Sequence, residues 1–183
     1  MPEKHPLDNV SVNHHVTQTP LTPEIMGNIG IHFHNKGQLE ESKKWLLAAL
    51  NAQKEYASYQ EVCYTHLGDI AKKEQDVNWK NYYQKGVECL AKRRKKTDLE
   101  IYHLASLYKK MGKQRDAIRW FKKMLDRYPH YSQLAGAFFH LGELYFIEKS
   151  NQKAEEMFRK CLSIFADHKK ATEYLDQIAS LMA

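Results

Sequence analysis

A four-residue phrase recurs at a fixed spacing in this chain, as His66-Leu67-Gly68-Asp69, His103-Leu104-Ala105-Ser106 and His140-Leu141-Gly142-Glu143, each 37 residues after the last. A looser version, Asn28-Ile29-Gly30-Ile31, lies 38 residues before the first. Self-similarity at a period of about 20–50 residues is typical of solenoids, in which stacked units bury a continuous core. Solenoids present extended concave binding surfaces, so the repeat predicts an interaction protein.

Each unit has the sequence pattern of two helices. In the third unit, Thr97 and Glu100 have the spacing of a capping box, and Gly112 is suited to the turn after the first helix. We expect the second helix to start at Asp116 and to stop at Tyr128-Pro129. The alternation of a half-buried strand is absent from the sequence, so the expected fold class is all-α.

The units resemble the tetratricopeptide repeat, whose pattern places a small residue after Leu, an aromatic further on, and then Ala and Phe in the second helix. The third unit matches with Ile101, Leu104-Ala105, Tyr108, Gly112, Ala117, Phe121 and Pro129, and the fourth with Phe138, Leu141-Gly142, Tyr145, Ala154 and Phe158. The resemblance implies a right-handed superhelical solenoid of about four helix-turn-helix repeats with a C-terminal capping helix.

The second unit departs from this pattern. Counting from Gly68 puts Gln84 in the slot for the large aromatic residue, while Tyr83 stands one residue early. A one-residue shift in the connection around 74–78 would restore the phase.

The expected organisation is a flexible N-terminal tail over residues 1–21, followed by one domain over 22–183. Thr22 is suited to cap the first helix. We expect the repeats at 23–56, 61–96, 98–131 and 135–168. A capping helix at 169–182 should turn Ala171, Tyr174, Leu175, Ile178, Leu181 and Met182 inward.

The composition excludes several classes of protein. No apolar run approaches the ~20 residues of a membrane span, and no signal peptide is evident behind Met1. Three unclustered cysteines favour a reducing, cytoplasmic compartment, and no catalytic motif, metal motif or cofactor motif occurs. We therefore expect a non-enzymatic protein without a cofactor or a metal.

Candidate binding residues follow from the face of each first helix that the resemblance turns toward the concave groove. They are Asn28, Thr65, His66, Asp69, Lys72, Lys73, Tyr102, His103, Ser106, Lys109, Lys110, Phe139, His140 and Glu143. Such a surface fits a protein or peptide with apolar groups and an acidic group. We expect protonation of its histidine ladder, His66, His103 and His140, below about pH 6 to weaken binding of a basic ligand and to strengthen binding of an acidic one.

Two other interpretations of the ladder stay open. The histidines could instead hydrogen-bond between neighbouring helices. A metal is disfavoured, since three imidazoles in a row fit poorly around tetrahedral zinc.

A basic run, Lys92-Arg93-Arg94-Lys95-Lys96, lies between the second and third units. It resembles a nucleic-acid patch, but no interleaved aromatic residues support base stacking, and the net charge of +6 is mild. We expect an exposed connection there, and a nucleic-acid partner is disfavoured.

The predicted function is thus a peptide-binding or protein-binding adaptor or assembly factor. The alternatives are a peptide-responsive regulatory sensor and a secretion-type chaperone, with a nucleic-acid-associated role less favoured. A monomer and a dimer are both compatible with the sequence, although a dimer would favour the chaperone.

Overall fold

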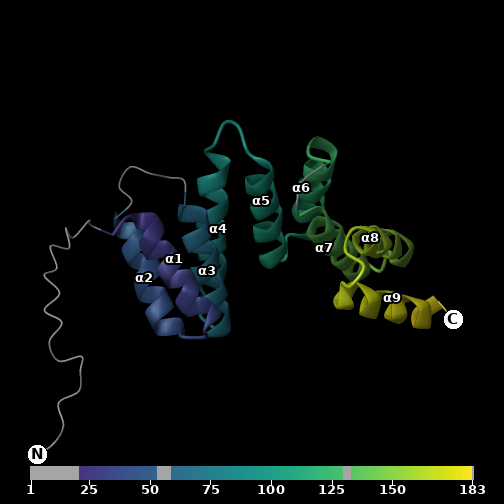
Figure 1. Cartoon of the computed structure of the whole chain (residues 1–183), viewed down its shortest axis with the longest axis horizontal. Coiled ribbons are helices and arrows are strands. Elements are labelled where there is room, and N and C mark those ends of the chain that lie inside the picture. The colour runs from purple at the N-terminus through teal and green to yellow at the C-terminus, as the bar shows by residue number, and fades with distance from the viewer. Residues whose placement is uncertain (1–20, 53–58, 130–132, 183) are drawn as a thin grey trace, which may run out of the picture.

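Residues 21–52, 59–129 and 133–182 are described by the computed structural model, and every regular element within them is an α-helix (Figure 1). The predicted tail lies, apart from Leu21, outside these residues. The helices are α1 (Pro23–Asn35), α2 (Leu39–Ala52), α3 (Gln60–Lys73), α4 (Trp79–Ala91), α5 (Asp98–Lys110), α6 (Gln114–Arg127), α7 (Leu134–Ile147), α8 (Asn151–Ile164) and α9 (Lys169–Met182).

The helices pack as consecutive pairs. The most extensive contacts join α1 to α2, α3 to α4, α5 to α6 and α7 to α8, and each pair then contacts the next helix along the chain. The pairs form an elongated row whose helix axes turn from upright at α1–α4 to nearly horizontal at α9 (Figure 1). This arrangement confirms the predicted solenoid of about four repeats with a capping helix.

A small residue lets the two helices of a unit approach each other closely. A Cβ atom added to Gly68 would lie 2.4 Å from the Tyr83 ring, and one added to Gly142 would lie 2.5 Å from the Phe158 ring. Tyr83 and Phe158 are almost fully buried. Tyr83 therefore fills the aromatic slot of the second unit, as the predicted one-residue shift requires.

The turn between paired helices uses one conformation at equivalent positions in all four units. Gly37, Gln75, Gly112 and Lys149 each follow the small residue by seven positions, and their φ angles are 74°, 59°, 76° and 58°. Since this is left-handed backbone, Gln75 and Lys149 carry a steric cost that glycine avoids. The large buried residue of the second helix follows this turn residue by nine positions in three units, but by only eight in the second unit. The second unit is therefore one residue shorter between Gln75 and Tyr83.

Most of the predicted helix boundaries agree with the structure. The Thr22 side chain accepts a hydrogen bond from the Ile25 amide, and Thr97 and Glu100 form the predicted capping box. Helix α6 ends at Arg127, before Tyr128-Pro129. The predicted start at Asp116 is wrong, because α6 already begins at Gln114, directly after the left-handed turn at Gly112.

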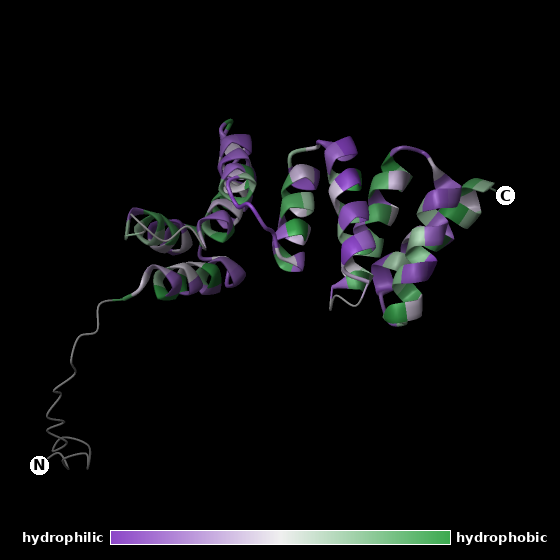
Figure 2. Cartoon of the chain, turned by 90° about the horizontal axis from the view of Figure 1, so that it is seen from above, coloured by the Kyte–Doolittle hydropathy of each residue, from purple (hydrophilic) through white to green (hydrophobic). Residues whose placement is uncertain are grey.

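Helix α9 covers the last repeat with its first three turns. Ala171 and Ile178 are buried, and Tyr174 stacks on Phe158 with ring centroids 4.8 Å apart. The expectation that Leu181 and Met182 face inward is wrong, since they are 65% and 58% exposed where the helix extends past its neighbour. Along the row, the helices carry both hydrophilic and hydrophobic residues (Figure 2). None of the helices in the described ranges has the length and hydropathy that crossing a bilayer requires.

The left-handed turns give a reciprocal test. Lys149→Gly should raise the free energy of unfolding by about 0.5–1 kcal/mol by removing side-chain strain, and Gly112→Lys should lower it by about 1–2 kcal/mol. Urea denaturation followed by circular dichroism measures both changes. Lys153→Gly, inside α8, is the control and should destabilise by about 1 kcal/mol. Destabilisation by Lys149→Gly would contradict the assigned turn.

Candidate functional site

The first helices of neighbouring units bring several predicted binding residues together. Thr65 and His66 of α3 and His103 and Ser106 of α5 line one small cavity of about 100 Å³, together with Val62 and Leu107. The Ser106 hydroxyl is buried and has no hydrogen-bond partner among the described residues. Residues 37 apart in sequence thus share one site.

Ion pairs across this face join α3, α5 and α7. Lys110 of α5 pairs with Asp69 of α3, which also accepts a 2.5 Å hydrogen bond from the Tyr83 hydroxyl. Lys109 of α5 pairs with Glu143 of α7, and its ammonium lies 2.8 Å from His140 Nδ1. Two of the four predicted groove lysines are therefore held within the protein.

Burial changes the titration of the histidine ladder. It lowers the pKa of His66 to about 4, with nearby His34 contributing, and it also lowers the pKa of His103. The expectation of protonation near pH 6 is therefore wrong for His66. Burial raises the pKa of Glu143, but hydrogen bonds from His140 and Lys109 outweigh it and hold the pKa below its usual range.

The remaining predicted groove residues lie in different surroundings. Phe139 belongs to the core, 7% exposed and 4.4 Å from the His168 ring between centroids. Tyr102 packs edge-on against Phe121. Exposed Asn28 accepts a 2.6 Å hydrogen bond from the Tyr59 hydroxyl. Lys72 extends over the Trp79 ring, and Lys73 is exposed.

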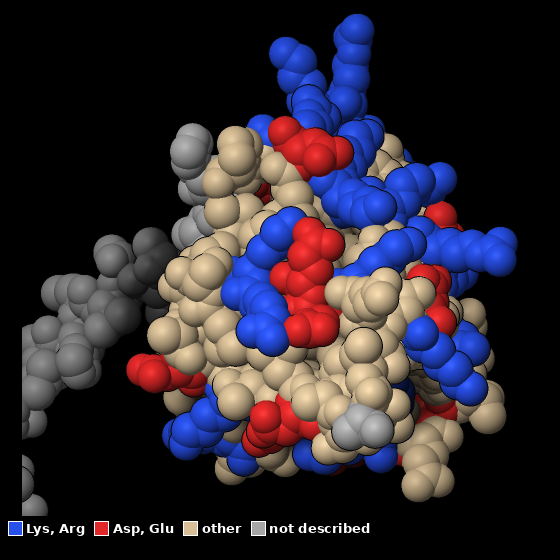
Figure 3. Space-filling model, turned by 90° about the vertical axis from the view of Figure 1, so that its right-hand side faces the viewer, with Lys and Arg blue, Asp and Glu red and all other residues tan. Residues whose placement is uncertain are grey.

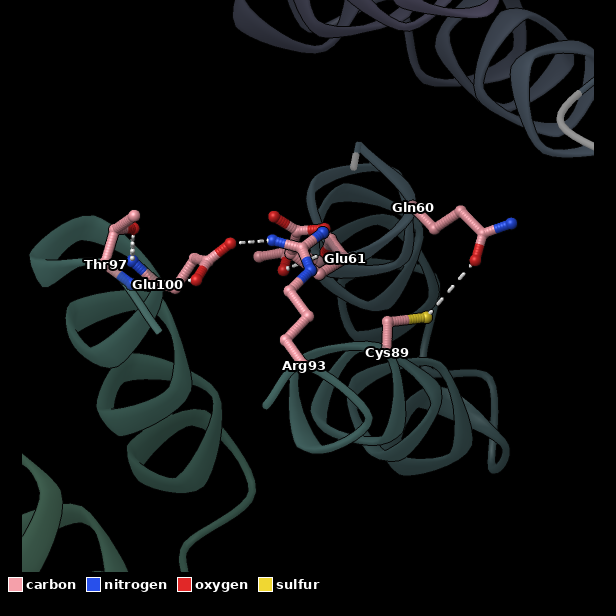
Figure 4. A network of polar contacts seen from close by, with 7 residues as sticks. Gln60, Glu61, Cys89, Arg93, Thr97 and Glu100 are labelled. Carbon is pink, nitrogen blue, oxygen red and sulfur yellow. Dashed lines mark hydrogen bonds and ion pairs between the residues drawn. The ribbon is translucent and has the colours of Figure 1, made fainter. Parts of the chain in front are cut away.

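The basic run does not form one uniform patch. Arg93 turns inward and bridges Glu61 of α3, at 3.0 Å, to Glu100 of α5, whose carboxylate also accepts from the Thr97 amide (Figure 4). Glu61 is only 4% exposed. Arg93 therefore joins the second and third units, while Lys92, Arg94 and Lys95 are exposed.

A basic cavity of about 410 Å³ adjoins this run. It is lined by two aromatic rings, an isoleucine and five cationic side chains, namely Trp120, Tyr128, Ile101, Arg94, Lys95, Lys96, Lys123 and Arg127. The connection 92–97 lies at the top of Figure 1, and Lys and Arg gather along the same upper edge in Figure 3. The aromatic residues missing from the run itself come from α6 and its end, which the sequence spacing did not reveal.

A larger cavity of about 610 Å³ lies between α6, α7 and α8. Its apolar lining is Leu125, Phe138, Leu141, Tyr145 and Met157, and its charged lining is Lys122, Asp126, Lys153, Glu156 and Lys160. This cavity was not predicted from the sequence, because the repeat pattern assigns Phe138, Leu141 and Tyr145 to packing within the repeat.

The two C-terminal units match the family model described as tetratricopeptide repeat, over residues 101–131 and 135–168. These two units are tetratricopeptide repeats. Solved structures extend the likeness in fold over 82–86% of the chain, at 15–23% identity.

Three of these structures illustrate the range of similar proteins. In "Crystal structure of APC/C hetero-tetramer Cut9-Hcn1" the TM-score is 0.65 at 16% identity, over 86% of this chain and 30% of the other. A tetratricopeptide repeat protein from Parabacteroides merdae gives 0.56 at 20% identity, over 86% and 60%. YrrB, described as "a TPR protein with an unusual peptide-binding site", gives 0.57 at 23% identity, over 82% and 73%. The chain thus spans less than two thirds of the first two structures.

The Arg93 bridge predicts a large stability effect. Arg93→Met should lower the free energy of unfolding by about 3–5 kcal/mol, because it leaves Glu61 buried without a counter-charge. Chemical denaturation measures the loss.

Arg94→Met, at the exposed neighbouring position, is the matched control and should change stability by less than about 0.5 kcal/mol. Adding Glu61→Leu to Arg93→Met should recover much of the loss, since it removes the uncompensated charge. Equal effects of Arg93→Met and Arg94→Met would contradict the bridge.

Proposed function

We propose that this chain is a non-enzymatic adaptor or assembly factor that binds a protein or peptide on the face formed by α1, α3, α5 and α7. The cavity between α3 and α5 carries this proposal. Small-molecule sites usually enclose about 300–1,000 Å³, whereas about 100 Å³ accommodates one branched aliphatic side chain. A peptide with an apolar anchor residue fits that size.

The charges around the cavity indicate where an acidic group of the ligand would bind. Lys109 and Lys110 already hold carboxylates of the protein. Lys72 and Lys73 at the end of α3 are exposed, so they are the cations of this face best placed to meet an acidic ligand group. We therefore expect an apolar residue at the cavity and an acidic residue toward Lys73.

The similar proteins support a binding role at the level of the fold. Tetratricopeptide repeats commonly serve as scaffolds for protein–protein contacts, and YrrB is described as having a peptide-binding site. The thiols of Cys63, Cys89 and Cys161 are free, which is compatible with a reducing cytoplasm. We place the protein in that compartment as part of the proposal.

A second candidate is an anionic partner at the basic cavity beside α6. The five cations around Trp120 and Tyr128 favour it. We expect the affinity for such an anionic partner to weaken steeply with salt concentration and to be lost in the double variant Arg94→Glu/Lys95→Glu. A regulatory sensor or a secretion-type chaperone has no comparable observation in its favour.

Filling the small cavity tests the principal proposal. Ser106→Leu should reduce partner capture from native lysate by at least about tenfold, because it occupies the anchor site. Ser180→Leu, at an exposed position of α9, is the control and should leave capture unchanged. Circular dichroism checks that both variants are folded.

A photo-crosslinking residue then locates the partner. Placed at Lys73 it should form an adduct with the captured protein, whereas at exposed Lys170 it should not. Capture that survives Ser106→Leu, with adducts formed only from Lys170, would overturn the proposed face.

A further inference from the structure

Three equivalent positions of the repeat, here called slots, carry different side chains at two places in the solenoid. Lys109, His140 and Glu143 occupy them between the third and fourth units. Two repeats earlier, between the first and second units, the slots hold His34, His66 and Asp69. His34 thus stands where Lys109 stands later, and the histidine and the carboxylate are retained.

Between the third and fourth units, one slot supplies a cation and the residues in the other two slots contact it. The Lys109 ammonium lies 2.8 Å from His140 Nδ1 and pairs with Glu143 Oε2, and those two atoms are themselves 2.9 Å apart. The imidazole and the carboxylate therefore converge on one positive charge carried by the protein itself.

Between the first and second units, the side chains of His34, His66 and Asp69 also lie close together, but no lysine occupies the slot that Lys109 occupies later. The His34 and His66 rings are in edge contact, with centroids 4.9 Å apart, and one donor atom each of His34, His66 and Asp69 lies within 4.8 Å of the others. Nδ1 of both histidines is buried and has no hydrogen-bond partner among the described residues. Two desolvated imidazole nitrogens without a partner are costly unless something binds them.

We propose that His34, His66 and Asp69 form a site for a divalent transition-metal ion, which takes the place that the Lys109 ammonium takes between the later units. Two imidazoles and one carboxylate, with a further position open to water, are a common ligand set for Zn²⁺. Ligand distances of about 2.1 Å require the three side chains to draw together by roughly 1 Å, which small rotamer adjustments allow.

The surroundings are compatible with this ligand set. Lys110 and Tyr83 both contact Asp69 through Oδ1, which leaves Oδ2 for a metal ion. Since His34 lies on α1 and the other two ligands on α3, the ion would tie the first unit to the second, in addition to any peptide-binding role.

Exchanging the residues between the two places tests the site. Isothermal titration of chelator-treated full-length protein with Zn²⁺ should find one equivalent of zinc that His34→Lys removes or weakens at least about 100-fold. Lys109→His, beside His140 and Glu143, should add one equivalent to the wild-type stoichiometry. His32→Ala, which changes an exposed histidine of α1 outside the triplet, should bind as wild type does.

All variants keep His5, His14 and His15, so zinc bound by those residues is common to every titration. A His34→Lys variant that is folded and binds zinc with wild-type stoichiometry and affinity would overturn the site. If His34→Lys loses its helical circular dichroism, Lys109→His decides. One added equivalent then supports the site, and an unchanged stoichiometry overturns it.

Discussion

The close approach of the two helices within each unit is the constraint on which the rest of this structure depends. It exists because the first helix has a glycine or an alanine where the second presents a large residue, as with Gly68 and Tyr83 or Gly142 and Phe158. A single pair leaves an apolar side uncovered, so neighbouring pairs must stack, and α9 covers the last of them. Stacking places the equivalent residues of successive units side by side, which turns a periodic sequence into a continuous surface.

Polar contacts between units determine what that surface offers to a ligand. Arg93 links the second unit to the third on one side, while Asp69–Lys110 and Lys109–Glu143 link α3, α5 and α7 on the other. These pairs use charges that the sequence pattern assigned to a ligand. The face keeps a small apolar cavity and exposed Lys73, so its selectivity would come from the shape of an anchor side chain more than from charge.

Much of the fold could be predicted from sequence because its determinants are local or periodic. The Thr97–Glu100 capping box, the turn at Gly112 and the phase shift before Tyr83 depend on residues a few positions apart. The site was harder to predict, because its properties depend on contacts between units. Nothing in the spacing shows that Phe139 is covered by α9, that Arg93 turns inward, that burial lowers the pKa of His66, or that His34 reaches His66.

A double-mutant cycle at Gly142 and Phe158 tests the central constraint most directly. Gly142→Ala alone should destabilise by about 1–3 kcal/mol, since its Cβ atom would collide with the Phe158 ring. Phe158→Leu alone should also destabilise, but the two together should cost less than the sum by about 0.5–3 kcal/mol, because each change makes room for the other. Chemical denaturation of the four proteins measures this coupling. Additive effects would contradict the account, because the two residues would then not limit how closely α7 and α8 pack.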